Sequence, residues 1–316
     1  MAISRKHFLK VSVILTLALG MILNPQDAAG KSRPAKNKKL AKRVLIITFD
    51  GIRVDGLAQA NTPNIDALIA EGSASMATRD VMPSVTLPNY TSHLLGAGPE
   101  VHGVVNNGWM IDDFKIPAVE TDADGYFPSV YKVLKDNVPG IKTAYYFNWK
   151  PLIRPLNQKY MDDILCVEDS EYPQLYDKAM GFIKENSGSP QFIFLYSGHT
   201  DEVGHKCEWM SPEYIKSIED GDAQVGRMIE FLKAEGLYED THIFFFSDHG
   251  GVGKGHGGVS EAEMVVPWVL RGPGIKEGFT ITEPNNTVNT ASTILRLFGL
   301  CQPLSWTGEV PCSIFK

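Results

Sequence analysis

Three short, almost continuous apolar runs, each ending in a polar turn, constrain the fold of this chain most strongly. They span residues 44–49, 192–196 and 242–246, and each is rich in β-branched or aromatic residues. Runs of this kind are typical of strands that are buried on both faces of a sheet. Residues 143–147 and 265–270 are further strand candidates.

Stretches with helical spacing alternate with these runs. The alternation predicts an α/β fold with a mostly parallel central sheet and helices on both faces, joined by right-handed crossovers. The segment 109–128 is rich in turn residues and lacks periodicity, which indicates an insertion near the mouth of a site. The expected helices span residues 62–71, 128–137, 173–185, 212–234 and 287–298.

The first thirty residues carry the pattern of an export signal. Basic residues at positions 5, 6 and 10 precede an apolar run at 11–23, and small residues follow at 28–30. This order is typical of a cleavable secretory signal. We therefore expect removal of residues 1–30 and a secreted or periplasmic protein. An uncleaved membrane anchor is the alternative, although the apolar run is short for a bilayer span.

The charge of the chain changes after the signal. Residues 31–43 hold seven basic residues and no acid, which indicates a solvated linker. From Val44 onward 20 basic residues face 36 acidic ones, and residues 44–316 are expected to form a single catalytic domain. This acidic body argues against a stable nucleic-acid complex and is compatible with carboxylates gathered around cations. No later segment suits a membrane span, and the sequence leaves the oligomeric state open.

Four cysteines are an even number for an apparently exported chain, so disulfides are permitted. Cys301 and Cys312 lie close together near the end of the sequence, and we expect them to pair. A bridge between Cys166 and Cys207 would complete the set, although the sequence leaves the connectivity open.

Aspartate and histidine residues gather directly after the three apolar runs. In open α/β sheets, ligands bind at the carboxyl ends of the strands. Each of these motifs taken alone could be a simple turn or a hydrogen-bonded surface pair. Three strand ends that all carry aspartate or histidine together predict a metal-binding site. Zinc accepts imidazole nitrogen and carboxylate oxygen, and six ligands suffice for two ions. The candidates are Asp50, Asp201, His205, Asp248, His249 and His256.

Thr86 is the candidate nucleophile. It precedes Pro88, a residue favoured in the first turn of a helix, so we expect Thr86 at a helix entrance. Free N–H groups and the helix dipole at such an entrance favour an anion. A helix cap is the alternative role for this threonine, because its hydroxyl is a weak nucleophile until a metal lowers its pKa.

These motifs, in this order, resemble the alkaline phosphatase superfamily, and within it the nucleotide pyrophosphatase/phosphodiesterase branch. The resemblance runs from about residue 44 to residue 274. The stretch 99–107, which ends in Asn107, also resembles that branch. The motifs are Phe49-Asp50-Gly51, Thr86-Leu87-Pro88-Asn89, Asp201-x-x-x-His205, Ser247-Asp248-His249-Gly250 and Gly255-His256-Gly257.

The resemblance implies a role for each residue. Two zinc ions would be bound, with Thr86 forming a phosphothreonine intermediate and Asn89 donating a hydrogen bond to a phosphoryl oxygen. One zinc would be held by Asp201, His205 and His256. The other would be held by Asp50, Asp248 and His249, together with the Thr86 oxygen.

The resemblance also bears on the substrate, a small phosphorylated molecule of nucleotide type. A monoester carries more negative charge than a diester and gains from a cationic clamp. Lys150 and Arg154 follow a predicted strand and are candidates for that clamp, with solvated surface charges as the alternative. Aromatic side chains are candidates to stack on a leaving group, with core packing as the alternative. They are Tyr90, Trp109, Tyr146 and Trp149.

We therefore predict a zinc-dependent phosphodiesterase or pyrophosphatase, with a phosphomonoesterase as the alternative. A phosphoryl-group transferase would reuse the threonine intermediate and pass the group to another acceptor. A sulfatase would need a Cys/Ser-x-Pro-x-Arg motif, which is not found around Thr86. A protein that only stores zinc is the non-enzymatic alternative.

Overall fold

The computed structural model describes residues 40–316, so the expected signal peptide and most of the basic linker lie outside it. Its centre is an eight-stranded sheet with the order β4-β3-β5-β1-β6-β7-β2-β8. Strand β1 (Arg43–Phe49) lies in the middle, parallel to β5 (Gln191–Ser197) on one side and β6 (Thr241–Phe246) on the other. These three are the apolar runs of the sequence, and all their residues are buried.

The flanking strands keep the sheet mostly parallel. Strands β3 (Lys142–Phe147) and β4 (Asp163–Cys166) extend it on one side with parallel pairing. On the other side β7 (Val265–Arg271) runs antiparallel to both β6 and β2 (Gly72–Arg79), and β8 (Phe279–Thr280) pairs in parallel with β2. The expected α/β class with a mostly parallel sheet is therefore confirmed.

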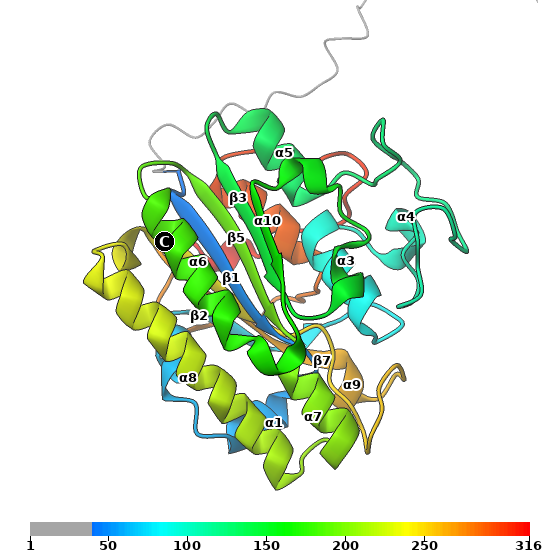
Figure 1. The fold of residues 1–316 in the computed structure, drawn as a ribbon, viewed down its shortest axis with the longest axis vertical. Coiled ribbons are helices and arrows are strands. Elements are labelled where there is room, and N and C mark those ends of the chain that lie inside the picture. The colour runs from blue at the N-terminus through cyan, green and yellow to red at the C-terminus, as the bar shows by residue number, and fades with distance from the viewer. Residues whose placement is uncertain (1–39) are drawn as a thin grey trace, which may run out of the picture. The chain divides into compact units, whose positions relative to one another are not determined.

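Helices cover both faces of the sheet (Figure 1). Because side chains alternate along a strand, Val44 and Ile46 of β1 belong to one core cluster while Leu45 and Ile47 belong to the other. The first cluster contains residues of α3 (Thr86–Leu95), α5 (Val130–Asn137) and α10 (Asn289–Leu297). The second contains residues of α1 (Val54–Gln59), α2 (Pro63–Ala70), α6 (Pro173–Glu185) and α8 (Pro212–Ala234).

The expected helices correspond to α2, α5, α6, α8 and α10. Both α6 and α8 begin at the prolines that the sequence suggests, and the Ser211 hydroxyl caps α8 by accepting from Tyr214 N–H, which satisfies an N–H that the helix leaves free. The segment 109–128 holds little regular structure beyond a bridge between Met110 and Asp113. The shorter helices are α4 (Pro99–His102), α7 (His199–Cys207) and α9 (Glu261–Met264). Single 3₁₀ turns span Lys150–Ile153, Gln158–Tyr160, Asp169–Glu171, Tyr238–Asp240 and Cys312–Ile314.

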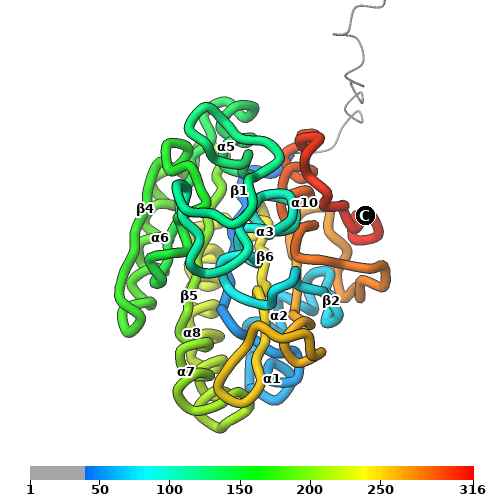
Figure 2. Tube along the Cα trace, turned by 90° about the vertical axis from the view of Figure 1, so that its right-hand side faces the viewer, coloured from blue at the N-terminus to red at the C-terminus, as the bar shows by residue number. Residues whose placement is uncertain are grey.

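The polar loops after β1, β5 and β6 meet at one end of the sheet. Figure 2 shows these three strands side by side, with α7 and the loop that follows β6 at the same end. The loop contacts α7 directly, because Lys254 Nζ donates to the Lys206 carbonyl over 3.0 Å. This edge is where the sequence predicts the site.

The cysteines depart from expectation. All four lie within residues 40–316 and no disulfide joins any of them, so both expected bridges are wrong. Closeness in sequence does not bring two Cβ atoms to the roughly 4 Å that a disulfide requires. Cys166 ends β4 at the sheet edge, whereas Cys207 ends α7. Within residues 40–316, no helix combines the length and the apolar character that crossing a bilayer requires.

Candidate active site

The strand ends bring all six predicted metal ligands together. Asp50 follows β1, Asp201 and His205 lie on α7 after β5, and the other three follow β6. Two groups of ligand atoms each lie within 4.8 Å of one another, namely Asp201 with His205 and His256, and Asp50 with Asp201 and His249. Asp201 belongs to both groups, and Asp248 Oδ2 lies 3.2 Å from His249 Nε2, so the six residues form one continuous cluster.

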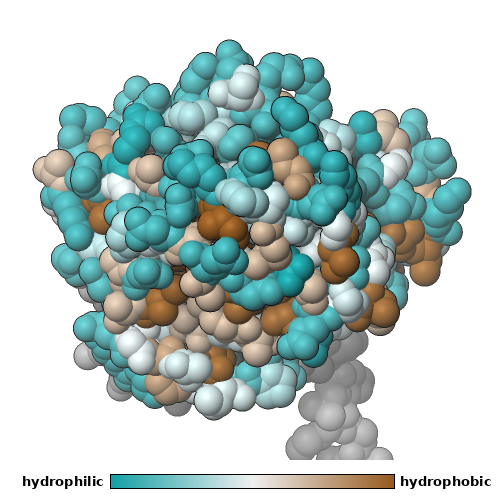
Figure 3. Space-filling view, turned by 90° about the horizontal axis from the view of Figure 1, so that it is seen from below, coloured by the Kyte–Doolittle hydropathy of each residue, from teal (hydrophilic) through white to brown (hydrophobic). Residues whose placement is uncertain are grey.

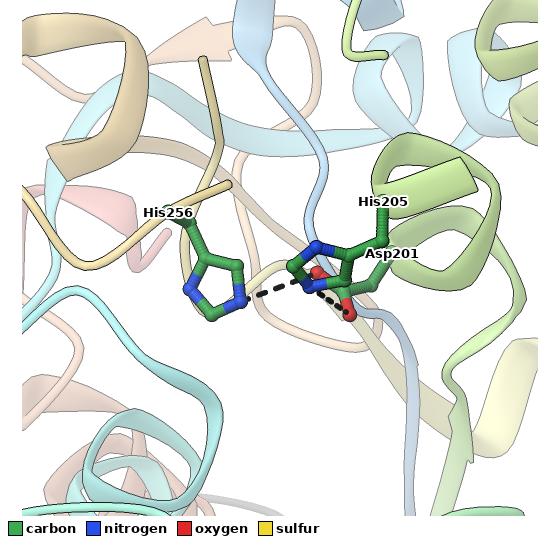
Figure 4. A group of neighbouring side chains, drawn as sticks. All are labelled: Asp201, His205 and His256. Atoms are coloured by element: carbon green, nitrogen blue, oxygen red, sulfur yellow. Dashed lines mark ion pairs between the residues drawn. The ribbon is translucent and has the colours of Figure 1, made fainter. Parts of the chain in front are cut away.

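We call Asp201, His205 and His256 the outer cluster (Figure 4). His205 Nε2 lies 3.4 Å from Asp201 Oδ2, and His256 Nε2 lies 3.7 Å from Asp201 Oδ1. The other ring nitrogens donate to backbone carbonyls, His205 to Lys254 over 2.9 Å and His256 to Ser84 over 3.0 Å. These bonds fix the tautomer and leave each Nε2 lone pair for a metal.

We call Asp50, Asp248 and His249 the deep cluster. All three are almost fully buried. His249 Nε2 lies 3.3 Å from Asp50 Oδ1 and 3.2 Å from Asp248 Oδ2, while His249 Nδ1 donates to the Gly250 carbonyl over 2.8 Å. The hydroxyl of Tyr196, near the end of β5, donates to Asp50 Oδ2 over 2.5 Å. The deep ligands are therefore held in place from several elements.

The charge balance of the clusters fits a bound cation. Asp50 Oδ1, Asp201 Oδ1 and Asp248 Oδ2 are buried without a hydrogen-bond partner, and unpaired buried charge is unfavourable. Burial, and then the negative charge of neighbouring carboxylates, raises the pKa values of Asp50 and Asp248 well above the usual range. Burial, and then the charge of His256, lowers the pKa of His249 to about 3. Divalent cations bound to these atoms would pair the carboxylates with opposite charge.

In the outer cluster the pKa values of the aspartate and of one histidine shift in the opposite direction. The hydrogen bond with Asp201 raises the pKa of His205 to about 9. For Asp201, burial alone would raise the pKa, but the bond with His205 and the nearby histidine charges outweigh it and lower the pKa. The outer residues thus pair with each other, whereas the deep carboxylates repel each other.

Thr86 lies beside the deep cluster. It is the first residue of α3, so the helix begins two residues before Pro88, and Val85 ahead of it is extended. Thr86 Oγ1 lies 3.2 Å from His249 Nε2. Asn107 Oδ1 accepts from the Leu87 N–H over 2.8 Å, which fixes the Asn107 side chain next to Thr86. This arrangement places a hydroxyl, a helix entrance and metal-type ligands at one point.

A cavity of about 180 Å³ opens onto this point. Thr86, Asp50 and Asn107 line it together with all three outer-cluster residues. No lysine or arginine lines this cavity among the described residues, whereas Asp169 and Glu202 do. The remaining lining residues are Asn148, Trp149, Tyr196 and Gly198.

Asn89 lies elsewhere. It is fully buried, its Oδ1 accepts from Val81 N–H over 2.8 Å, and its Nδ2 donates to the carbonyls of Val81, Pro83 and Val85, each over 3.2 Å. Its amide is therefore used to hold the loop that leads into α3. The expected hydrogen bond from Asn89 to a phosphoryl oxygen does not fit this position.

Two of the aromatic stacking candidates are core residues. Tyr90 is 1% exposed, its hydroxyl shares a 3.0 Å hydrogen bond with Thr48, and its ring packs edge-on against Tyr196. Tyr146 is fully buried. This burial leaves no room for a leaving group against either ring. Trp109 packs on Leu87 and is 9% exposed, while Trp149 does line the cavity.

The expected cationic clamp does not reach the cavity. The Lys150 side chain is 78% exposed and lies 3.4 Å from Glu168. Arg154 follows the 3₁₀ turn Lys150–Ile153, and its N–H donates to the Pro151 carbonyl. Neither side chain lines the cavity. The residue that follows β3 and lines the cavity is Asn148, which carries no charge.

Sequence reasoning missed four polar residues of the wall, namely Asn148, Asp169, Tyr196 and Glu202. Asn148 follows β3 directly, so the rule that strand ends carry ligands would have identified it. Its Oδ1 accepts from Gly198 N–H over 2.8 Å, and its Nδ2 donates to Asp169 over 2.7 Å. Tyr196 lies inside an apolar run, where only its hydroxyl signals a polar role. Glu202 neighbours Asp201 but carries no distinguishing pattern.

Comparisons with known proteins agree with these motifs. The model of the type I phosphodiesterase/nucleotide pyrophosphatase family matches residues 44–254. An uncharacterized pyrophosphatase/phosphodiesterase of Schizosaccharomyces pombe is 27% identical over 66% of this chain and 44% of its own length. Ectonucleotide pyrophosphatase/phosphodiesterase family member 3 of Rattus norvegicus is 26% identical over 66% of this chain and 24% of its own. The chain thus spans less than half the length of these relatives.

Solved structures share the fold. Human ectonucleotide pyrophosphatase/phosphodiesterase 5 superposes with a TM-score of 0.70 and 15% identity, covering 85% of this chain and 97% of that one. An inactive variant of the murine protein, in complex with AMP, gives 0.69 and 16% identity over 83% and 96%. At this level of identity the likeness concerns the fold alone.

Proposed function

The chain belongs to the type I phosphodiesterase/nucleotide pyrophosphatase family, and from that premise we propose that it hydrolyses phosphodiester or pyrophosphate bonds of small phosphorylated substrates. Thr86 is the nucleophile of this proposal and two zinc ions are its cofactors. The observation that carries it is the 3.2 Å contact of Thr86 Oγ1 with His249 Nε2 at the edge of the six-ligand cluster.

The ligands divide between two ions. The outer cluster of Asp201, His205 and His256 would hold one, and the deep cluster of Asp50, Asp248 and His249 would hold the other beside Thr86. Imidazole and carboxylate donors suit zinc. When bound, such ions lower the pKa values of coordinated hydroxyl groups and water and offset the charge of the phosphoryl group.

The chain's own residues provide attack and positioning. The Thr86 hydroxyl loses its proton to solvent as Oγ1 forms a bond to phosphorus, the bond from phosphorus to the departing oxygen breaks, and a phosphothreonine results. A water molecule then attacks phosphorus and releases the Thr86 oxygen. Asn107 is oriented because its Oδ1 accepts from Leu87 N–H, and its NH₂ group is then available to donate to a phosphoryl oxygen. Asn107 thus takes the role that the resemblance assigns to Asn89.

The cavity favours a diester over a monoester. A dianionic monoester gains from added cations, whereas this wall carries Asp169 and Glu202 and no lysine or arginine among the described residues. A singly charged diester meets less repulsion there. A phosphomonoesterase is the second candidate. It ranks lower because Lys150 would have to leave Glu168 and turn toward the cavity to supply the cation that a monoester needs. A transferase would use the same threonine with an acceptor other than water.

Residues 1–30 would be a cleaved signal and 31–43 a basic linker, with residues 44–316 forming the catalytic domain of a secreted or periplasmic enzyme. The substrate would be nucleotide-like, because the aromatic side chain of Trp149 lines the cavity and could stack on a base. The acidic body gives no reason to expect a stable nucleic-acid complex.

The test compares two p-nitrophenyl substrates on the zinc-loaded mature protein. They are p-nitrophenyl phosphate and the p-nitrophenyl ester of thymidine 5′-monophosphate. We expect faster cleavage of the diester and its loss in Thr86→Ala, with Thr280→Ala on the exposed position of β8 as the control that keeps full activity. Faster monoester cleavage would move the assignment to a phosphatase. Lack of turnover of both esters by folded, zinc-loaded protein would contradict hydrolysis.

A further inference from the structure

Trp209 lies in the short connection between α7 and α8, and its indole ring packs against the outer cluster. The ring centre lies 5.1 Å from that of His205 and 5.9 Å from that of His256, edge-on in both pairs. Aromatic rings favour such edge-to-face contacts. The residue is 5% exposed. Trp209 therefore joins the two histidines of the outer cluster, which belong to different segments of the chain.

Two glycines make room for the indole ring. Gly204 precedes His205 on α7, and a Cβ there would lie 2.7 Å from the ring. Gly251 belongs to the loop that carries His256, and a Cβ there would lie closer still. Because glycine has no Cβ, the ring can lie directly on the backbone of both segments. The indole thus fills the space between α7 and the loop.

Hydrogen bonds fix the indole in this place. Trp209 Nε1–H donates to the Gly51 carbonyl over 2.8 Å, and the Trp209 backbone N–H donates to the Gly253 carbonyl, also over 2.8 Å. Gly51 follows Asp50 of the deep cluster, and its own N–H donates to Asp248 Oδ1 over 3.2 Å. Trp209 is therefore bonded both to the loop and to the backbone beside the deep ligands.

The loop that carries His256 has little apolar burial of its own. Val252 is 52% exposed and Val259 is 74% exposed, so these side chains do not hold the loop on the core. Figure 3 views this end of the molecule from below and shows hydrophobic residues at the surface among hydrophilic ones. Segments with few buried apolar contacts open readily. The contact of the indole with Gly251 supplies such burial to the loop.

Trp306 shows how a tryptophan packs away from the ligands. It is 4% exposed, donates its Nε1–H to the Pro128 carbonyl and fills the space beside Gly96. Its burial, its hydrogen bond and its glycine contact thus match those of Trp209. Pro128 and Gly96 belong to neither ligand cluster, so Trp306 provides a matched control for the loss of a buried indole.

We infer that Trp209 is a positioning residue for the outer metal site. Its ring would hold His205 and His256 at the separation at which both bind one ion. The inference rests on the proposed function, in which the outer cluster binds zinc. It adds to that function a residue that is neither a metal ligand nor part of the cavity wall. Loss of a group that orients metal ligands lowers metal affinity by about tenfold to a hundredfold.

The test measures zinc affinity and does not depend on turnover. The purified protein is stripped of metal and titrated with zinc in competition with a chelating dye, and the binding step that His205→Ala removes is assigned to the outer site. We expect Trp209→Leu to weaken this step by about tenfold or more. Trp306→Leu should leave it unchanged. Urea unfolding of the metal-free proteins shows whether each variant is folded.

Gly251→Ala tests the same contact while Trp209 is kept. The added Cβ would meet the indole and displace it, so the affinity of the outer site should again fall by about tenfold. This variant carries the test if Trp209→Leu does not fold. In the double variant the ring atoms that the Cβ would meet are absent, so the two losses should not add. Additive losses would overturn the inference.

The outcomes separate the inference from the proposed function. Wild-type zinc affinity in folded Trp209→Leu or in Gly251→Ala would overturn the inference and leave the proposed function standing. An equal loss of affinity in Trp306→Leu would also overturn it, because a general effect of packing would then explain the loss. If the wild-type protein itself binds no zinc, the two-zinc proposal fails and the inference fails with it.

Discussion

The deep and outer clusters, which we propose as two metal-binding sites, differ in burial. The deep cluster follows two central strands and is fully enclosed, whereas the outer cluster lies on α7 and a glycine-containing loop, with the His205 side chain 42% exposed. Asp50 and Asp248 repel each other, while Asp201 pairs with two histidines. This difference implies that only the deep cluster depends on a cation for its charge balance.

The largest loss of activity is expected from a substitution in the deep cluster. Asp50→Asn removes a carboxylate that Tyr196 orients, and the proposed metal beside Thr86 would lose a charged ligand. We expect kcat/KM to fall by about a thousandfold, as for loss of a central electrostatic group, measured on the thymidine ester. Added zinc should not restore the activity. Recovery at high zinc would show that the deep cluster is as exchangeable as the outer one.

A substitution in the outer cluster should cause a smaller loss of activity, and added zinc should reverse that loss. His205→Ala removes an exposed ligand while Asp201 and His256 remain, so we expect about a hundredfold loss at limiting zinc, at the upper end of what metal-site changes cost. Titration with zinc should recover most of the rate. A matched control is His199→Ala, which stacks on Tyr172 outside both clusters. If His205→Ala stays inactive at saturating zinc, the distinction between the clusters fails.

Tyr196→Phe probes the support of the deep cluster. The substitution keeps the ring, which packs on Tyr90, and removes only the hydroxyl that donates to Asp50. Loss of such a supporting hydrogen bond to a ligand costs about tenfold in metal affinity or activity. Zinc affinity from competition with a chelating dye would measure it, and unchanged affinity would show that the bond does not orient Asp50.

Both the successes and the failures of sequence reasoning follow from packing. Strands β1, β5 and β6 were predictable because burial on both faces demands a continuous apolar run, and the ligands follow them because strand ends meet at one edge. Strand β2 was missed because its sequence, GSASMATR, is made of small residues rather than the β-branched residues typical of strands. Small residues fit there because Cβ at Gly72 would lie 2.5 Å from the Leu270 carbonyl oxygen.

The two asparagines show where the sequence is insufficient. Asn89 and Asn107 both belong to stretches that resemble the family, and residue type alone does not distinguish their roles. Asn89 lies in the first turn of α3, where its amide meets the carbonyls of the preceding loop. Asn107 returns to Leu87 from twenty residues away. Only the tertiary path of the chain decides which amide faces the cavity.

A substitution of Asp80 tests whether the repulsion between buried carboxylates extends beyond the six proposed metal ligands. It is buried, both its carboxylate oxygens lack a hydrogen-bond partner, and burial, followed by the charge of Asp248, raises its pKa to about 9. The folded state therefore binds more protons than the unfolded state between about pH 4 and pH 9, and stability falls as pH rises through that window. Asp80→Asn does not titrate, so its stability should depend less on pH.

Between pH 5 and pH 7.5 we expect the free energy of unfolding of metal-free Asp80→Asn to gain about 3 kcal/mol relative to that of the wild type, because this interval lies wholly inside the window. Urea unfolding at the two pH values measures it. The exposed Asp113→Asn serves as the control and should show no such change. Equal slopes for the wild type and Asp80→Asn would show that Asp80 is ionised in the folded protein.

The smallest effect is expected at Lys150, outside both clusters. Its ammonium group is exposed and paired with Glu168 across 3.4 Å, and an exposed pair contributes less than about 1 kcal/mol. Lys150→Ala should therefore change kcat/KM by less than about twofold on both the monoester and the diester. A selective loss on p-nitrophenyl phosphate would mean that Lys150 reaches the phosphoryl group during turnover. The charge balance of the cavity would then be set by motion of the chain after β3, and the preference for diesters would lose its basis.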